Sequence, residues 1–356
     1  MTKTILRLTL AGIFLVLTVI LVMLANFLPD FFFSFYPDVS RSLLSVLAGV
    51  TSIVPFAVCE IAAFALIALL ILCLIRAIVK RRIVRFLAGL VLCVSALVFA
   101  FVALWGLNYY APPMAQRLGM EETQYSVAQL QEAAEYYRDM ANAAAKNVER
   151  DDTGAMIAYD FDALAETAGE GFEVLAQEYE CFDGSTVRVK RLIISPIMGK
   201  IGMTGGFICL TGEACVSSTA YNAAMPFTMC HEISHRMAFA REDEANFGGF
   251  LACSVSDRPE FVYSGYYMAF RYCYNALAEV DAEAAAEVWA GVSAELAADC
   301  HASAKHYEAV RDETASEIAD SVYDGYLNAF SVESGVQSYG EVTDLLILWY
   351  FEKCAA

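Results

Sequence analysis

The chain has 356 residues, of which 58% are hydrophobic and 18% are charged, and its formal net charge is −19 at pH 7. Soluble globular proteins usually contain about 25% charged residues, so part of this chain is expected to lie outside water. The high apolar and aromatic content excludes a disordered protein, and the acidic balance argues against a nucleic-acid partner because acidic surfaces repel phosphate backbones.

The charge is divided unevenly along the chain. Residues 1–107 hold eight Lys or Arg residues and three Asp or Glu residues, whereas residues 108–356 hold fifteen and thirty-nine. We therefore expect two domains, a transmembrane domain over 1–107 and an acidic, well-packed domain over 108–356.

Three apolar runs lie in the first part, at about 8–28, 56–75 and 86–107. Each is long enough to cross about 30 Å of hydrocarbon at about 1.5 Å per residue. The alternative for the first run is a cleaved signal peptide, but the run is longer than a signal core and shows no small-residue cleavage site, so we expect an uncleaved anchor.

Polar and aromatic residues mark the ends of these runs. Glu60 in the second run is expected to reach the outer interface or to pair with a neighbouring helix, rather than to mark a proton path. Trp105, Tyr109 and Tyr110 are typical of the aromatic belt at a membrane surface.

The cations predict the orientation. Lys3 and Arg7 precede the first run, and residues 76–85 between the second and third runs contain five cations. Under the positive-inside rule, the N-terminus and this loop are cytoplasmic. The sequence thus predicts a multi-pass protein of the bacterial cytoplasmic membrane, in contact with the lipid bilayer, with an extracytoplasmic C-terminal domain.

The second part is predicted to be mainly helical with a small sheet. Residues 126–180 have helical composition, and Ser126 begins a capping pattern with Gln at the third position. The segments 186–195 and 206–217 have strand composition, and helical composition returns from Pro226 onward. The expected fold class is α+β, mostly α.

The pattern His-Glu-x-x-His occurs at residues 231–235. On a helix, positions i and i+4 lie on one side, so the imidazoles of His231 and His235 can bind one Zn²⁺ at about 2.0–2.1 Å each. Glu232 is placed to act as a general base on zinc-bound water. The alternative is a helix with two incidental histidines.

A hydrolytic zinc site needs a third protein ligand. The candidate ligands that follow are Glu242 and Glu244, which face opposite sides of a helix, so only one can bind the ion; we prefer Glu242. A continuous helix would place Glu242 about 13 Å from the histidines, so the site requires a reversal around 236–241. Asn246 shares the face of Glu242, where it could hydrogen-bond a ligand.

Other residues have weaker signals for roles in hydrolysis. Gly206 and Glu213 lie in the strand-like run before the motif, where an edge strand could pair with a peptide substrate; Glu213 could equally be a surface acid. Tyr339, Tyr267 and His301 are candidate donors to an oxyanion, although each could instead be structural.

The combination of HExxH with E-x-x-A-N at residues 242–246 resembles the gluzincin-type zinc peptidases, which include membrane-bound prenyl-protein and stress-response peptidases. In that family the first Glu of the second motif is the third ligand, which implies Glu242 here, with Asn246 replacing the usual Asp. Only six residues separate His235 from Glu242, a shorter gap than in the membrane peptidases, which predicts a tight connection.

The chain also resembles a bacterial membrane family known only as a domain of unknown function. The matching stretches are residues 105–110, 195–199, 211–214, 226–232, 241–247 and 338–342. The resemblance implies an extracytoplasmic zincin-like domain but no substrate. The sequence is interpreted as a membrane-anchored zinc metallopeptidase acting on a peptide or protein substrate. The alternatives are a non-catalytic zincin-fold binding, sensor or scaffold protein, and a transporter-like or signalling membrane protein.

Overall fold

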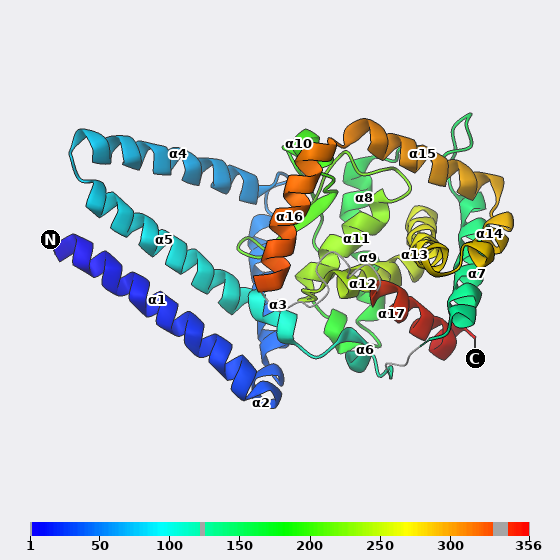
Figure 1. Cartoon of the computed structure of the whole chain (residues 1–356), viewed down its shortest axis with the longest axis horizontal. Helices are drawn as coiled ribbons and strands as arrows, with labels where there is room; N and C mark the ends of the chain where they lie inside the picture. The colour runs from blue at the N-terminus through cyan, green and yellow to red at the C-terminus, as the bar shows by residue number, and fades with distance from the viewer. Residues whose placement is uncertain (1, 122–124, 330–340, 356) are drawn as a thin grey trace.

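The computed structural model describes residues 2–121, 125–329 and 341–355. Its main feature is a mostly helical body from which three long apolar helices extend to one side (Figure 1). These are α1 (Thr2–Phe27), α4 (Val58–Val79) and α5 (Ile83–Leu104), each long and apolar enough to cross a membrane. The three predicted apolar helices are therefore confirmed, although α5 ends before residue 107.

The remaining helices form the body and its junction with the apolar helices. They are α2 (Pro29–Phe33), α3 (Tyr36–Thr51), η1 (Gly106–Tyr110), α6 (Met114–Arg117), α7 (Val127–Ala144), η2 (Ala145–Asn147), α8 (Phe161–Thr167), α9 (Glu170–Leu175), η3 (Glu180–Phe182), α10 (Ser195–Lys200), α11 (Met225–Arg236), α12 (Glu242–Ser254), α13 (Pro259–Val280), α14 (Ala282–Ala290), α15 (Ala294–Val310), α16 (Glu313–Ala329), α17 (Glu341–Trp349) and η5 (Tyr350–Cys354). The predicted capping box at Ser126 is present at the start of α7.

The sheet is small. It contains β1 (Lys190–Arg191), β2 (Gly205–Ile208) and β3 (Glu213–Val216) in the order β1-β3-β2, with β1 parallel and β2 antiparallel to β3. Only two residues of the predicted strand at 186–195 pair with a neighbour, and the run 206–217 is a hairpin whose second strand is central.

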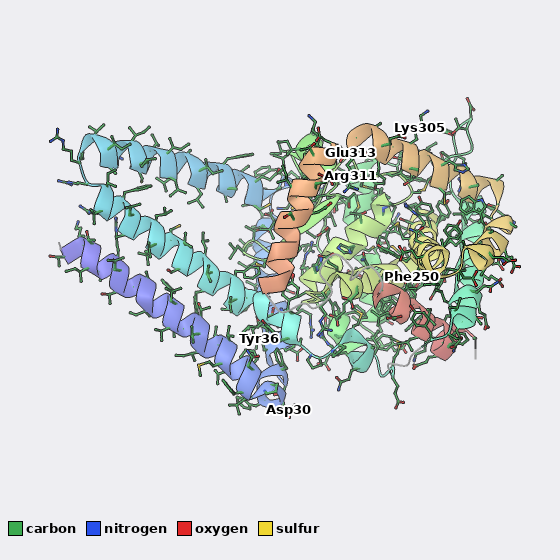
Figure 2. All side chains as sticks on the ribbon, in the orientation of Figure 1. Asp30, Tyr36, Phe250, Lys305, Arg311 and Glu313 are labelled. Atoms are coloured by element: carbon green, nitrogen blue, oxygen red, sulfur yellow. The ribbon has the colours of Figure 1, made fainter. Side chains whose placement is uncertain are left out.

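The core of the body lies between its helices. Tyr137 is fully buried and its hydroxyl donates to the carbonyl of Leu346 at 2.7 Å, which joins α7 to α17. Phe250 of α12 lies inside the body, whereas Tyr36 lies where the apolar helices meet it (Figure 2).

The helix α3 belongs to this junction. Arg41 is 5% exposed, and its guanidinium donates to the carbonyls of Asp183 at 2.9 Å and Cys181 at 3.3 Å. The backbone N–H of Ser185 donates to the Ser45 hydroxyl at 3.0 Å. A division of the chain at residue 107 therefore separates segments that pack against each other.

Two buried acids connect the body to the start of α4. The Glu213 carboxylate accepts the N–H groups of Val58 at 2.8 Å and Cys59 at 2.7 Å, and it pairs with Lys190 at 2.6 Å. Burial raises the pKa of Glu213, but Lys190 and the backbone donors outweigh burial and hold the pKa below its usual value. Glu213 is 2% exposed on the central strand, so the prediction of a substrate contact or a surface acid is wrong.

Glu60 makes the reciprocal connection. Its carboxylate accepts the N–H groups of Ile193 at 2.8 Å and Ile194 at 2.9 Å, just before α10. Glu60 is 7% exposed and bonds to the backbone of the body, rather than pairing with another apolar helix. The strand β3 thus supplies an acid to the backbone at the start of α4, and α4 supplies an acid to the backbone between β1 and α10.

Replacing Glu213 is expected to destabilise the protein strongly. Glu213→Ala leaves the Lys190 ammonium buried without its carboxylate and removes the acceptor for the start of α4, at a cost of about 3–5 kcal/mol. Thermal unfolding of the full-length protein in detergent measures this. Glu308→Ala at an exposed site is the control and should change stability by less than about 0.5 kcal/mol. Equal melting temperatures for the two variants would contradict this role of Glu213.

Candidate metal site

The site is built on α11, α12 and the turn between them. Pro226 lies in the first turn of α11, where a missing N–H costs no hydrogen bond. The chain reverses after Arg236, and Ala238 adopts a left-handed φ of 70°. The next helix begins at Glu242 with three acids in its first turn, where the helix dipole favours negative charge. The predicted reversal over 236–241 is confirmed.

The two helices approach closely at the motif. A Cβ at Gly249 would lie 3.0 Å from the backbone nitrogen of His231, so a glycine favours the close approach of α12 to α11. Ala245, on the same face, is fully buried. These two small residues therefore allow the contact that brings Glu242 to the histidines.

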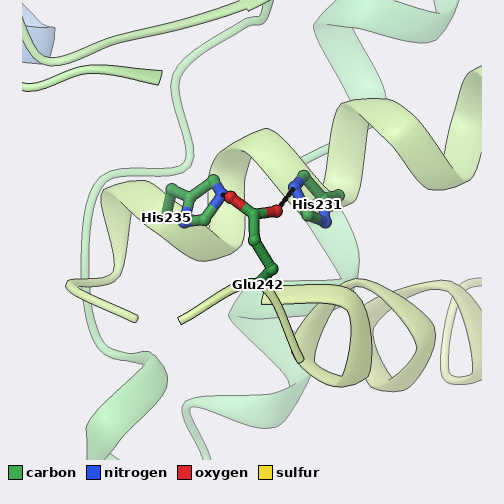
Figure 3. Close-up of side chains that lie close together, drawn as sticks. All are labelled: His231, His235 and Glu242. Carbon is green, nitrogen blue, oxygen red and sulfur yellow. Dashed lines mark ion pairs between the residues drawn. The ribbon is translucent and has the colours of Figure 1, made fainter. Parts of the chain in front are cut away.

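Three side chains converge at this crossing. The Glu242 carboxylate lies between the two imidazoles, with Oε2 3.3 Å from Nε2 of His231 and Oε1 3.6 Å from Nε2 of His235 (Figure 3). One ligand atom from each residue lies within 4.8 Å of the others. The side chain of Glu242 is 26% exposed and that of His235 is 6% exposed, so the triad is open on the Glu242 side. This triad could hold a metal ion.

A backbone carbonyl fixes the orientation of the His235 ring. Its Nδ1 lies 2.7 Å from the carbonyl oxygen of Phe239, in the turn between the helices. This contact favours a proton on Nδ1 and leaves Nε2 as the atom that faces Glu242. Nδ1 of His231 is buried and has no hydrogen-bond partner in the described part of the chain.

The other predicted residues of α12 lie nearby with different contacts. Glu244 accepts the N–H of Met114 at 2.7 Å and lies 3.7 Å from Nη1 of Arg241, so the structure brings Glu242 rather than Glu244 to the histidines. Asn246 is buried one turn after Glu242. Nδ1 of His231 has no hydrogen-bond partner among the described residues, so Asn246 does not bond that ligand.

Glu232 is buried beside the triad. It is 4% exposed, and its Oε2 has no hydrogen-bond partner within residues 2–121, 125–329 and 341–355. Burial raises the pKa of Glu232 to about 7, with Glu242 acting in the same direction and the two histidines against it. An orphaned buried carboxylate oxygen is costly, which indicates a group positioned for a ligand or a proton.

The charges of the triad are coupled. Burial lowers the pKa of His235, but the Glu242 carboxylate outweighs it and raises this pKa to about 9. Burial raises the pKa of Glu242, yet His235 and His231 together hold it well below its usual value. Glu242 is therefore ionised at neutral pH and offers an anionic oxygen.

The sheet reaches Glu232 through β2. A Cβ at Gly205 would lie 2.3 Å from Oε1 of Glu232, whereas a Cβ at Gly206 would meet nothing within 4 Å. β2 is a terminal strand of the sheet, so the predicted edge-strand position of Gly206 matches the topology.

Two contributions to the site were missed by sequence reasoning. The Trp105 ring lies 5.9 Å from the His235 ring, and its Nε1–H donates to the His235 carbonyl at 3.4 Å. Arg241 donates to the carbonyls of Tyr109 at 3.4 Å and Ala111 at 3.3 Å. The segment that leaves α5 therefore supports both metal-site helices, and Trp105 and Tyr109 are buried packing residues rather than an exposed aromatic belt.

The predicted oxyanion donors do not join the triad through any described contact. The Tyr267 hydroxyl is buried and accepts from Nη1 of Arg271 at 3.2 Å. His301 is exposed on α15, with its ring 6.1 Å from that of Trp289. Tyr339 lies outside the described residues.

The fold and site define a mostly helical protein with three candidate membrane spans and a His–His–Glu triad that could hold a metal ion. The chain belongs to the family described as protein of unknown function (DUF3810), whose model matches residues 34–347. No curated protein and no solved structure matches it.

Proposed function

We propose that this protein is a membrane-anchored zinc metallopeptidase with a zincin-like outer domain, which hydrolyses peptide bonds outside the cytoplasmic membrane. The observation that carries the proposal is the His231–His235–Glu242 triad with the orphaned carboxylate of Glu232 beside it. The orientation follows from the cations in the first two turns of α1 and around the turn that joins α4 to α5.

The donor set suits zinc. Two imidazole nitrogens and one carboxylate oxygen form a common protein ligand set of hydrolytic zinc sites, which leave a further position open. His231, His235 and Glu242 would hold the ion. When bound, zinc supplies Lewis-acid chemistry, by polarising a carbonyl and making water more acidic.

The protein's own groups perform the proton transfers and position the substrate. Glu232 takes a proton from the attacking water at its free oxygen and returns it to the leaving amine. Burial of Glu232 favours both steps, because a buried carboxylate is a stronger base than an exposed one. β2 offers the unpaired backbone groups of a terminal strand, which can pair with an extended peptide.

The alternative is a binding or sensor protein that holds the metal without turnover. A structural metal site needs no adjacent buried carboxylate, and burying one without a partner is unfavourable. Glu232 therefore favours hydrolysis.

Metal removal tests the activity. Full-length protein in detergent is expected to cleave members of a fluorogenic peptide library, to lose this activity with a chelator, and to regain it with Zn²⁺. The full chain is required because α3 and Trp105 contact the outer domain and its site. Cleavage that persists in chelator would point to a contaminating peptidase and contradict the metal dependence.

Gly205→Ala is expected to lower kcat/KM by about 100-fold, because the added methyl displaces the Glu232 carboxylate and misplacing a catalytic group by about 1 Å has an effect of this size. Gly206→Ala is the matched control on the same strand and should retain activity. Kinetics with one library substrate compare the two variants. Equal loss in both would mean that the strand, rather than the base, is disturbed.

A further inference from the structure

An exposed apolar surface lies on the body beside the start of α4. We call it the apolar collar, and its members are Ile53, Phe56, Ile193, Ile197, Ile208 and Leu210. These side chains are between 38% and 82% exposed. Soluble proteins rarely expose large apolar side chains in one contiguous group without a partner.

Hydrogen bonds place three members next to α4. The N–H of Ile193 donates to Glu60 in the first turn of α4, and Ile197 follows one turn later on α10. Ile208 pairs across the sheet with Glu213, whose carboxylate accepts the first N–H groups of α4.

The other members lie around the end of α3. The Thr51 hydroxyl donates to the carbonyl of Thr211 at 3.1 Å, which brings the turn containing Leu210 to the residues just before Ile53. Phe56 precedes Ala57, which is buried in a cluster with Leu192 and Cys215. The apolar collar thus borders the point where α4 leaves the body.

The charge pattern of this region differs from the rest of the body. Residues 184–212 contain four Lys or Arg residues and no Asp or Glu, although residues 108–356 contain thirty-nine acids. Arg191 and Lys200 in this stretch are exposed. Carboxylates are expensive to bring to a bilayer, whereas exposed cations are compatible with lipid headgroups.

We propose that the apolar collar rests in the outer boundary between headgroups and acyl chains of the bilayer that α4 crosses. The occupant is lipid because the surface is continuous with the first turn of a candidate span. The inference rests on the proposed membrane location. The contact also fixes how far the site lies from the membrane. The strand β2 carries Ile208 at one end and passes Glu232 at Gly205. The expected substrates are therefore peptide segments close to the membrane surface.

Quenching by brominated lipids tests the proposal. Full-length Ile197→Trp and Ile208→Trp variants are placed in liposomes with brominated acyl chains, and their fluorescence is compared with that of the wild type, which has three tryptophans. Ile67→Trp, within α4, reports the span. Val280→Trp, at the exposed C-terminal end of α13, is the matched control; α14, which follows it, lies at the far end of the body from the apolar helices (Figure 1).

The added fluorescence at positions 197 and 208 is expected to be quenched as at 67 and to resist aqueous iodide, while that at 280 responds to iodide alone. Quenching at 67 without quenching at 197 and 208 would overturn the apolar collar as a lipid contact and leave the membrane location intact. Absence of quenching at 67 would overturn the membrane location as well. All four positions are exposed on the protein, so the variants should keep the wild-type melting temperature.

Discussion

Glu232→Gln is expected to lower peptide hydrolysis by about 10²–10⁴-fold while the metal remains bound. Glutamine keeps the shape of the side chain but cannot accept the proton of the attacking water. The three groups that would hold the metal are unchanged. Steady-state kinetics on a library substrate, with metal content measured on the same preparation, check both parts of this expectation.

The catalytic account also predicts that Glu232→Gln folds as stably as the wild type. Because Oε2 of Glu232 has no partner among the described residues, its replacement removes a desolvated acid and should not lower the melting temperature. Glu308→Gln, at an exposed site, is the matched control for activity. Wild-type kcat/KM in Glu232→Gln would show that Glu232 is not the base, and a lower melting temperature would show that its side chain stabilises the fold.

Much of the site could be predicted because its signals are local. The i, i+4 spacing of His231 and His235 places both on one side of any helix. A continuous helix would keep Glu242 too far from the histidines to share a metal ion, so a reversal was required, and the structure contains one at Ala238. Choosing Glu242 over Glu244 was possible only as a preference, since the deciding contact is the distant N–H of Met114.

The junction between the apolar helices and the body could not be predicted, because its contacts join residues that are far apart in the sequence. Glu213 lies 154 and 155 residues from the backbone groups that it bonds, and no periodicity links them. Trp105 ends an apolar run, where tryptophan is typical of a membrane surface, and its packing on His235 depends on how two distant segments meet. The strand at 186–195 was overestimated because β-branched composition does not determine how many residues find a partner.

The central claim is a zinc site made by His231, His235 and Glu242. His235→Ala and Glu242→Ala are each expected to lose the metal, since each removes one of three protein ligands. Glu244→Gln should keep it, because an amide oxygen can still accept the N–H of Met114 and the side chain does not face the histidines. The three variants thus distinguish the two acids that the sequence left open.

Elemental analysis of full-length protein purified in detergent is the most direct test. The prediction is one zinc per chain in the wild type and in Glu244→Gln, and none in His235→Ala or Glu242→Ala. Folded wild-type protein that holds no metal under zinc-replete conditions would contradict the metallopeptidase and leave a membrane-anchored binding protein. Zinc retained in Glu242→Ala but lost in Glu244→Gln would contradict the ligand set itself.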